Sequence, residues 1–559
     1  MKIKFYPASG NKTISSSGAA TALLAALCAG APAWAQVAAP GLAPNLIDPA
    51  ALQRQEMERR RLLEQTPQPA QAPPAVLHKE QAQAAQAAAP AASGVQFTLK
   101  QLRFSSSAFL GERELAELAA RHTGREYDFA GLAAIVAEVN ALYLRHGVLT
   151  GRAMLPPQRI ENGVVTIELV EARLGQLDVT GNSYTRPGYV ASWLASEQGK
   201  TLDAQVLEDR IKRFNRVGEM QMEANLRPGA SFGLTDIVLA VREPARFQLR
   251  VFANNEGSQS IGREQVGIDT AVNGPAGIGD RLALYLTRSR GATLGSLSYS
   301  VPVNRWGGHL SATYGNSATD VIAGPYRALD ITGTSHSLQL AMVQPVWQNE
   351  AWWFDLAASA GTTKSENLTG GVLLSKSTIH NQTASATVAG VLANRSLNLA
   401  LTATHASATA AATAQREFNV RQLTASWVEN LGTKQFLLLR ASMQDSNDAV
   451  LAPSLLFQLG GGATVRGYEV GVLSGDRGYL FNLEWHRTIS DSVGAYLFHD
   501  TGEVRTVGLP HQSAKSVGAG LDWQWGAALR ANVTAGYALD KVQADQANWR
   551  VTGRLSYDF

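Results

Sequence analysis

The chain has 559 residues and a formal net charge of +3, a length that suits several domains or one very large one. The charge is too small to indicate a nucleic-acid-binding protein, and no dense basic stripe with interleaved aromatic residues occurs, so no nucleic-acid partner is expected. Beyond the N-terminal segment, no stretch approaches the roughly 18 consecutive apolar residues that a membrane-spanning helix needs. If the protein lies in a membrane, it crosses as strands.

Residues 1–35 have the pattern of a secretory signal peptide. Lysines precede an apolar run that starts at Ala19, and the small residues Ala33 and Ala35 mark a cleavage site after Ala35. The single cysteine of the chain, Cys28, lies inside this segment. The exported chain is therefore expected to have no disulfide framework, so a large fold or a membrane must supply its stability.

Residues 36–65 are predicted to contain a helix, with Asp48 as the N-cap and Pro49 at the first helical position. The helix is mostly polar, which fits a helix in solvent, a disordered segment, or a helix lodged in a water-filled barrel. The residues alone leave these alternatives open. Residues 66–94 are rich in Pro, Ala and Gln and are predicted to form a flexible linker.

Two units of similar pattern follow, residues 95–172 and residues 173–243. In the first unit, a strand pattern precedes a helix that is capped by Asp128, and two more strands follow it. In the second unit, strands surround a helix near residues 187–196 and another helix after Asp203. We therefore predict two β-α-α-β-β modules of roughly 75 residues each, and repeats of this kind suggest a binding array.

Residues 244–559 change to an alternation of apolar and polar residues with period two, interrupted by turn residues. The last strand has aromatic residues at its end on one face and polar residues on the other. Its predicted outer residues are Val551, Leu555, Tyr557 and Phe559, and its predicted inner residues are Arg550, Thr552, Arg554 and Ser556. This arrangement indicates a transmembrane β-barrel with a water-filled lumen. About 315 residues, at roughly 20 for each strand and turn, predict about 16 antiparallel strands.

One loop of the predicted barrel, residues 458–478, contains the sequence GGATVRGYEV with an arginine, Arg466, after a glycine run. In the two strands that follow the loop, the period-two pattern places Glu484 and Asp500 toward the lumen. A carboxylate can form a charge-assisted bidentate bond with an arginine. An incoming Arg466 is therefore expected to find an acidic partner on the inner wall.

These sequences resemble a known family. The run TVRGYEVGVLSGDRGYLFNLEW together with LFHDTG is similar to the signature of the polypeptide transporters of the outer-membrane insertase superfamily. The first module contains YLRHGVLTGRAMLPPQRIENGVVTIELVEA and the second NRVGEMQMEANLRPGASFGLTDIVLAV, and they resemble the two POTRA (polypeptide-transport-associated) modules of two-partner secretion transporters of the TpsB type. With the barrel segment SLSYSVPVNRWGGHLSATYG, the resemblance covers nearly the whole mature chain.

The resemblance implies a transmembrane β-barrel of about 16 antiparallel strands, preceded by two periplasmic POTRA modules and an N-terminal plug helix. It implies that the protein lies in the outer membrane of a Gram-negative bacterium and that the loop of residues 458–478 folds into the barrel. The implied loop tip is Val465, Arg466, Gly467 and Tyr468. The implied contact on the wall is Phe498, Asp500 and Gly502 of an F-x-D-x-G pattern, with Glu484 as a less specific addition.

The resemblance also implies a function. The protein binds an unfolded, large exoprotein of the TpsA type, which carries an N-terminal secretion domain, and moves it through the barrel to the cell surface without ATP. Because an extended segment can add to the edge of a sheet as a new strand, we predict substrate-binding edges in both modules. Their residues are Val164, Ile167 and Val170 in the first module, and Ile237, Leu239 and Val241 in the second. Outer-membrane lipid is a further expected partner, as is the barrel-assembly machinery, through the C-terminal strand that ends at Phe559.

Three other functions stay open at this point. An outer-membrane insertase of the same superfamily typically has a longer POTRA array. A barrel enzyme would need a catalytic set, but the histidines form no metal-spaced pair and no G-x-S-x-G sequence occurs. A passive porin would not need the two modules. We therefore predict no catalytic residues, no metal ligands and no cofactor.

Overall fold

The computed structural model of the chain describes residues 48–64, 77–79, 96–146, 148, 151–231, 233–410, 415–448 and 450–559. The predicted signal peptide, residues 1–35, lies outside these ranges, and so does most of the predicted linker. Within the described ranges, no helix is long and apolar enough to cross a membrane.

The first module has a sheet of three strands in the order β3-β6-β5, which packs against two helices. Its elements are β2 (Phe97–Thr98), β3 (Gln101–Phe104), α3 (Glu112–His122), β4 (Glu126–Tyr127), α4 (Phe129–Arg145), β5 (Gly151–Met154) and β6 (Val164–Glu171). Asp128 caps α4 as predicted, because its carboxylate accepts a hydrogen bond of 2.7 Å from the Gly131 N–H. Ile135 and Val139 of α4 are buried in the apolar cluster of this module, which therefore has a core of its own.

The second module has a sheet in the order β1-β8-β9-β7. Its elements are β7 (Arg173–Thr180), α5 (Pro187–Ser192), the 3-10 helix η2 (Ala195–Glu197), α6 (Ala204–Val217), β8 (Gln221–Pro228) and β9 (Leu234–Arg242). The helix α6 begins after Asp203, as predicted, and Asp203 caps it by accepting a hydrogen bond of 2.9 Å from the Gln205 N–H. The fourth strand, β1 (Leu77–Lys79), comes from the predicted linker and pairs in parallel with β8. The segment of residues 66–94 thus contains one short strand that the sequence did not predict.

The predicted substrate-binding edges are wrong. The first set of residues lies on β6, the middle strand of its sheet, and the second set lies on β9, which is flanked by β8 and β7. Their side chains are mostly core, with Ile167, Ile237 and Leu239 fully buried. The residues that were wrongly predicted to lie at sheet edges are Val164, Ile167, Val170, Ile237, Leu239 and Val241. An edge is defined by unpaired backbone groups, and β6 and β9 each pair with a strand on either side.

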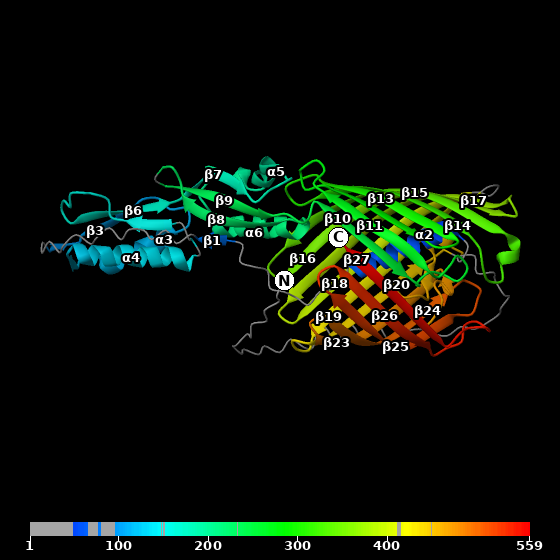
Figure 1. Cartoon of the computed structure of the whole chain (residues 1–559). Coiled ribbons are helices and arrows are strands. Elements are labelled where there is room, and N and C mark those ends of the chain that lie inside the picture. The colour runs from blue at the N-terminus through cyan, green and yellow to red at the C-terminus, as the bar shows by residue number, and fades with distance from the viewer. Residues whose placement is uncertain are drawn as a thin grey trace. The chain divides into compact units, whose positions relative to one another are not determined.

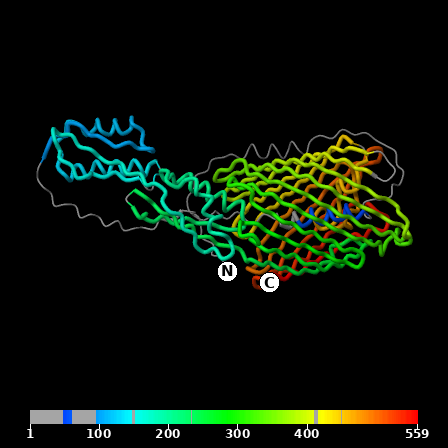
Figure 2. Tube along the Cα trace, turned by 90° about the horizontal axis from the view of Figure 1, so that it is seen from above, coloured from blue at the N-terminus to red at the C-terminus, as the bar shows by residue number. Residues whose placement is uncertain are grey.

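Sixteen antiparallel strands form a closed barrel, which confirms the predicted number (Figure 1; Figure 2). The strands are β10 (Phe247–Asn254), β11 (Gln265–Asn273), β12 (Arg281–Arg288), β13 (Ala292–Pro302), β14 (His309–Asp320), β15 (Ile331–Gln348), β16 (Trp352–Thr369), β17 (Val372–Leu392), β18 (Arg395–Ala410), β19 (Arg416–Asn430), β20 (Gln435–Ser446), β23 (Arg477–Ser490), β24 (Val493–Arg505), β25 (Gln512–Trp525), β26 (Leu529–Ala538) and β27 (Trp549–Asp558). Consecutive strands pair, and the barrel closes between β10 and β27. Short 3-10 helices, η3 (Arg327–Leu329) and η4 (Pro453–Leu455), lie in two of the loops.

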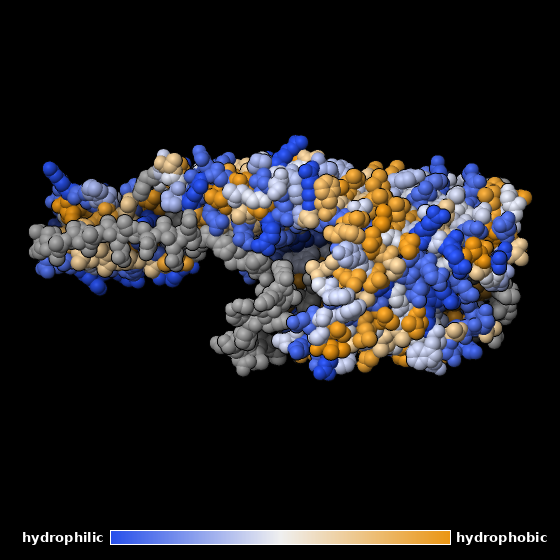
Figure 3. Space-filling model, in the orientation of Figure 1, coloured by the Kyte–Doolittle hydropathy of each residue, from blue (hydrophilic) through white to orange (hydrophobic). Residues whose placement is uncertain are grey.

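Side chains of the barrel strands alternate between the outer surface and the lumen. In β27, Val551 and Leu555 are 58% and 49% exposed, whereas Thr552 and Ser556 are each 9% exposed. Apolar side chains gather on the visible outer surface of the barrel (Figure 3). An apolar outer face and a polar inner face are what a barrel in a lipid bilayer requires, so the predicted facing of the last strand is confirmed.

The helix α2 (Pro49–Glu64) lies inside the barrel (Figure 1; Figure 2). Asp48 caps it as predicted, and accepts a hydrogen bond of 2.8 Å from the Ala50 N–H. Its first turns make polar contacts with inward side chains of β14, β15 and β16. These are Ser365 Oγ to Asp48 at 3.1 Å, Ser317 Oγ to the Pro49 carbonyl at 3.1 Å, and Gln53 Nε2 to Ser337 Oγ at 3.1 Å. Of the alternatives that the sequence left open, the structure therefore has the helix in the lumen.

Candidate functional site at the inward loop

The connection between β20 and β23 folds inward and forms a small two-stranded hairpin, β21 (Phe457–Leu459) and β22 (Leu473–Gly475). The loop begins after Ser446 and ends before Arg477, so it starts earlier than the predicted residue 458. Gly460 and Gly467 have φ angles of +106° and +119°, a region that side chains other than glycine rarely adopt. The glycines therefore allow the chain to reverse within the confined lumen.

Arg466 binds the carboxylate of Asp500 on β24 through three hydrogen bonds. The Arg466 backbone N–H and Nε donate to Asp500 Oδ2 at 2.9 and 3.0 Å, and Nη2 donates to Oδ1 at 2.6 Å. Asn482 Nδ2 and Ser516 Oγ donate to the same carboxylate at 2.8 and 3.1 Å. Asp500 is fully buried, and these donors satisfy a charge that would otherwise be costly to bury. The predicted pair of Arg466 and Asp500 is thus present in the structure.

The other side of the Arg466 guanidinium group contacts Glu484 and an aromatic ring. Arg466 Nη1 lies 2.9 Å from Glu484 Oε1, and Arg440 Nη1 lies 3.3 Å from the same oxygen. His486 Nε2 lies 2.7 Å from Glu484 Oε2. The guanidinium carbon lies 3.7 Å from the centroid of the Phe498 ring, a favourable cation–π position. The structure brings the predicted Glu484 and Phe498 to the arginine and adds Arg440 and His486, whose contacts the sequence did not predict.

Val465 and Tyr468 anchor the loop tip on either side of the arginine. Both side chains are buried in an apolar cluster with the hairpin and the wall. The Tyr468 hydroxyl lies 2.9 and 2.8 Å from the carbonyl oxygens of Lys515 and Asp540. The tip is therefore fixed by packing and hydrogen bonds as well as by charge.

Two glycines of the barrel wall leave space for the loop. A Cβ at Gly502, the last residue of the predicted F-x-D-x-G pattern, would lie 2.8 Å from the Leu459 side chain. A Cβ at Gly536 would lie 2.6 Å from the carbonyl oxygen of Arg466. Contacts this short force the neighbouring atoms to move. Gly502 is therefore part of the site through close approach, and Gly536 is a site residue that the sequence analysis missed.

We expect Gly536→Ala to weaken docking of the loop by about 1–3 kcal/mol, the usual range for overpacking a tight contact. Chymotrypsin cleavage after Tyr468, which is buried in the docked loop, should become faster in the folded, detergent-solubilised barrel. Gly494→Ala is the matched control, because a Cβ at Gly494 has its nearest neighbours at 3.9 Å. Equal cleavage of the two variants would mean that the close approach at Gly536 does not hold the loop.

Glu469, the residue after the predicted tip, makes a further ionic contact that the sequence analysis missed. Its Oε1 lies 2.6 Å from Arg550 Nη1 on β27 and also binds Arg263 in the turn between β10 and β11. The arrangement fixes the loop at two separate places on the wall, β24 and the closing strands. These contacts are reversible ionic and hydrogen bonds, so the site is suited to holding and releasing a segment rather than to bond chemistry.

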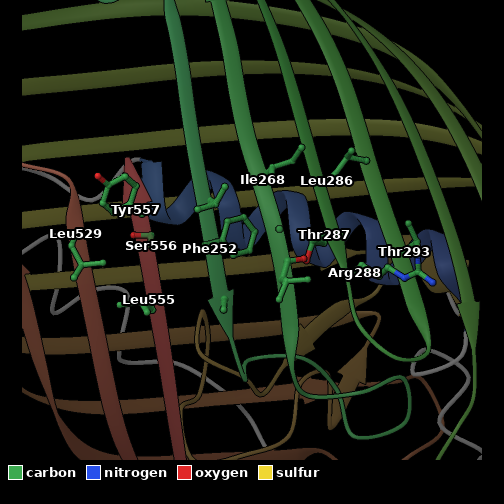
Figure 4. Close-up of a pocket in the computed structure, with 14 residues that line it drawn as sticks. Phe252, Ile268, Leu286, Thr287, Arg288, Thr293, Leu529, Leu555, Ser556 and Tyr557 are labelled. Atoms are coloured by element: carbon green, nitrogen blue, oxygen red, sulfur yellow. The ribbon is translucent and has the colours of Figure 1, made fainter. Parts of the chain in front are cut away.

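A second polar cluster holds the middle of α2 near the closing strands. Arg59 Nη2 lies 2.5 Å from Glu56 Oε1 and also binds Glu256. The Tyr285 hydroxyl donates to Glu56, and Arg554 of β27 lies 3.9 Å from Glu256. Figure 4 shows the helix behind the strands that carry Phe252, Ile268 and Leu286. Among the described residues, no group of His, Cys, Asp and Glu is arranged to hold a metal ion.

Known proteins with similar sequences and structures exist. The family profile described as haemolysin secretion/activation protein ShlB/FhaC/HecB matches residues 233–525, and the ShlB-type POTRA domain matches residues 97–172. The heme/hemopexin transporter protein HuxB of Haemophilus influenzae strain 86-028NP is 26% identical over 76% of this chain and 80% of its own length. The outer membrane transporter CdiB of Dickeya dadantii is 24% identical over 81% of this chain and 83% of its own length. The solved structure of CdiB from Escherichia coli has a TM-score of 0.68 at 20% identity and covers 91% of this chain and 99% of its own.

Proposed function

Because the chain belongs to the haemolysin secretion/activation family ShlB/FhaC/HecB, a family of two-partner secretion transporters in the outer membrane, we propose that it takes up an unfolded exoprotein through its POTRA modules and passes it through the barrel. The POTRA modules lie in the periplasm, and members of the family act with secreted exoproteins. The proposed partner of this chain is a large TpsA-type exoprotein with an N-terminal secretion domain.

The observation that carries the proposal is that the lumen holds two separate obstructions, α2 and the inward loop, and that polar contacts hold both. The loop tip binds the wall through Arg466 and Asp500, and α2 binds through Glu56 and Arg59. A lumen with polar walls is wet, so water can replace these contacts when either segment moves. A passive porin has no need of two such removable segments.

At rest, we propose, α2 and the loop close the pore, and the arriving polypeptide favours the state in which both have moved. Substrate binding must therefore be stronger in the open state than in the closed one. ATP is not needed if the exoprotein folds at the cell surface and cannot slide back. Capture in the periplasm uses strand addition, in which an extended segment pairs with a free sheet edge through its backbone. The outermost strands of the two module sheets are β3 and β5 in the first module and β1 and β7 in the second, in place of the β6 and β9 residues predicted from sequence.

Two further partners complete the proposal. Outer-membrane lipid covers the apolar face of the barrel, where residues such as Leu555 and Val551 are exposed. The barrel-assembly machinery recognises the C-terminal strand β27 together with Phe559, which follows it and is 74% exposed.

Deletion of this chain in its host tests the proposal. We expect the exoprotein encoded beside it to accumulate in the periplasm, while the amounts of other outer-membrane barrels stay unchanged. Re-expression of the full chain should restore the exoprotein at the cell surface. A general loss of other barrels would favour an insertase instead, and an unchanged amount of surface exoprotein would refute the transport function.

A further inference from the structure

The junction between β10 and β27, which closes the barrel, is held in two different ways along its length. Near the end of β27, residues 250–254 of β10 pair with residues 554–558 in a regular ladder, whereas β10 pairs with β11 over its whole length. Toward the start of β27, the side chain of Asn255 replaces part of the ladder: Nδ2 donates to the Val551 carbonyl at 3.1 Å, and Oδ1 accepts from the Gly553 N–H at 2.7 Å. The Asn255 N–H also donates to the Gly553 carbonyl at 3.2 Å. In this part of the junction, which we call the outer seam, one backbone hydrogen bond is thus supplemented by two from the Asn255 side chain.

Glu469 bridges the two sides of the outer seam from inside the barrel. Its carboxylate binds Arg263, which follows β10, and Arg550, near the start of β27. Arg550 Nη2 also donates to the Gly257 carbonyl at 3.2 Å, so the cation lies between the two strands. The Arg550 side chain is 12% exposed, and removal of its partner would leave a confined cation without its counter-charge.

We propose that Glu469 is a positioning residue that clamps the outer seam closed, so that the seam loosens when the inward loop leaves the wall. The inference extends the proposed transport function to its mechanism. Glu469 stands three residues after Arg466, and the two residues bind different parts of the wall, the closing strands and β24. A displacement that frees one of them strains the other, because three residues span at most about 11 Å of extended chain.

The outer surface of the junction is apolar beside its regular ladder. A groove of about 640 Å³ lies there, and its lining includes Leu555 and Tyr557 (Figure 4). Leu555 and Tyr557 are among the exposed apolar side chains of the barrel, so lipid fills this groove in the membrane. Lipid offers no hydrogen bonds to strand edges. The charged groups that hold the neighbouring outer seam come from the lumen side, where Glu469 binds Arg263 and Arg550.

The test measures seam opening in the purified full chain in detergent, without any exoprotein. A cysteine replaces Thr552, an inward residue of β27 that is 9% exposed, and its labelling rate with a small, charged thiol reagent reports access. Cys28 is the single cysteine of the sequence. When the segment that contains it is removed, the introduced cysteine is the one thiol that the reagent can label. We expect Glu469→Gln to raise this rate about tenfold, which corresponds to about 1.4 kcal/mol in the opening equilibrium.

Matched variants separate a local effect from general loosening. A cysteine at Ser335, a fully buried inward residue of β15, should label at the same slow rate with or without Glu469→Gln. Glu366→Gln removes an ion pair with Lys376 on β16 and β17 and should leave labelling at position 552 unchanged. Glu469→Asp, which keeps the charge, should restore most of the protection.

Unchanged labelling at position 552 in Glu469→Gln would overturn the proposal, and so would an equal rise at positions 335 and 552. Neither result depends on an exoprotein. The labelling experiment can therefore refute the clamp even when the full chain exports normally in cells. Conversely, a failure of export would not change the labelling result.

Discussion

Replacing Arg466 with alanine is expected to release the loop tip from the barrel wall while the barrel stays assembled. The substitution removes two side-chain hydrogen bonds to Asp500 and the contact with Glu484. The backbone N–H at position 466, which also donates to Asp500, is kept. Breaking a buried charge pair typically costs about 3–5 kcal/mol. The lower end applies, because Asp500 keeps Asn482 and Ser516 as donors. A cost of about 3 kcal/mol shifts the loop toward release on the order of a hundredfold.

The wall itself should tolerate the change, because Glu484 also keeps its contacts with Arg440 and His486. The folded barrel should therefore keep its electrophoretic mobility in unheated detergent samples, while export of the exoprotein is depressed, because an unanchored loop occupies the lumen without a defined position. Chymotrypsin cleavage after Tyr468 measures release directly, since that side chain is buried in the docked loop.

Two comparison variants sharpen this experiment. Arg466→Lys keeps the charge but lacks the planar fork that binds a carboxylate at two atoms, so its cleavage rate should fall between those of the wild type and Arg466→Ala. Arg395→Ala removes an ion pair of 3.1 Å with Glu429 on neighbouring strands and should cleave like the wild type. Normal export together with a protected Tyr468 in Arg466→Ala would remove the arginine from the mechanism.

The features of the site that could be predicted are those in which the local sequence determines whether a strand side chain points into the lumen or out of the barrel. Period-two alternation placed Glu484 and Asp500 in the lumen, and the structure has both there. The pairing of Arg466 with Asp500 required the family resemblance, because alternation tells which face a side chain occupies and not which loop reaches it. The partners of Glu469 show the limit clearly, since Arg263 lies 206 residues away in the chain and its approach depends on closure of the whole barrel.

The POTRA edges show a different reason for failure. The runs around Ile167 and Ile237 were correctly predicted as strands, and the helices that begin after Asp128 and Asp203 were also predicted, whereas the position of α3 was not. Their position in the sheet depends on which other strands flank them: β3 and β5 flank β6, and β7 and β8 flank β9. A pattern of apolar side chains indicates which face of a strand is buried. An edge strand is defined by unpaired backbone groups, and the side-chain pattern does not show where these are.

Deletion of residues 49–64 is expected to open the pore without unfolding the barrel. Leu52 is buried in a small apolar cluster with Ile261 and Leu294. The other contacts of the helix are mainly polar: those of its first turns, those of Glu56 and Arg59, the bond from Arg54 to the Ser454 carbonyl and the ion pair of Arg60 with Asp269. Removing it leaves Glu256 beside Arg554, so each keeps an opposite charge in the lumen. The sheet itself does not depend on the helix, because the barrel strands pair with one another all the way round.

A helix with its side chains is about 10–12 Å wide, and barrels of 16 strands without a plug enclose an aqueous channel. We therefore expect single-channel conductance in planar bilayers to rise roughly threefold or more when the helix is deleted. Arg59→Ala should produce intermittent openings of the same size, because it leaves Glu56 and Glu256 without their shared cation while the rest of the helix still fits the lumen. Met57→Ala, which changes a side chain that is 37% exposed, should conduct like the wild type. If the deletion variant conducts no more than the intact protein, the loop alone closes the pore and α2 is not the plug.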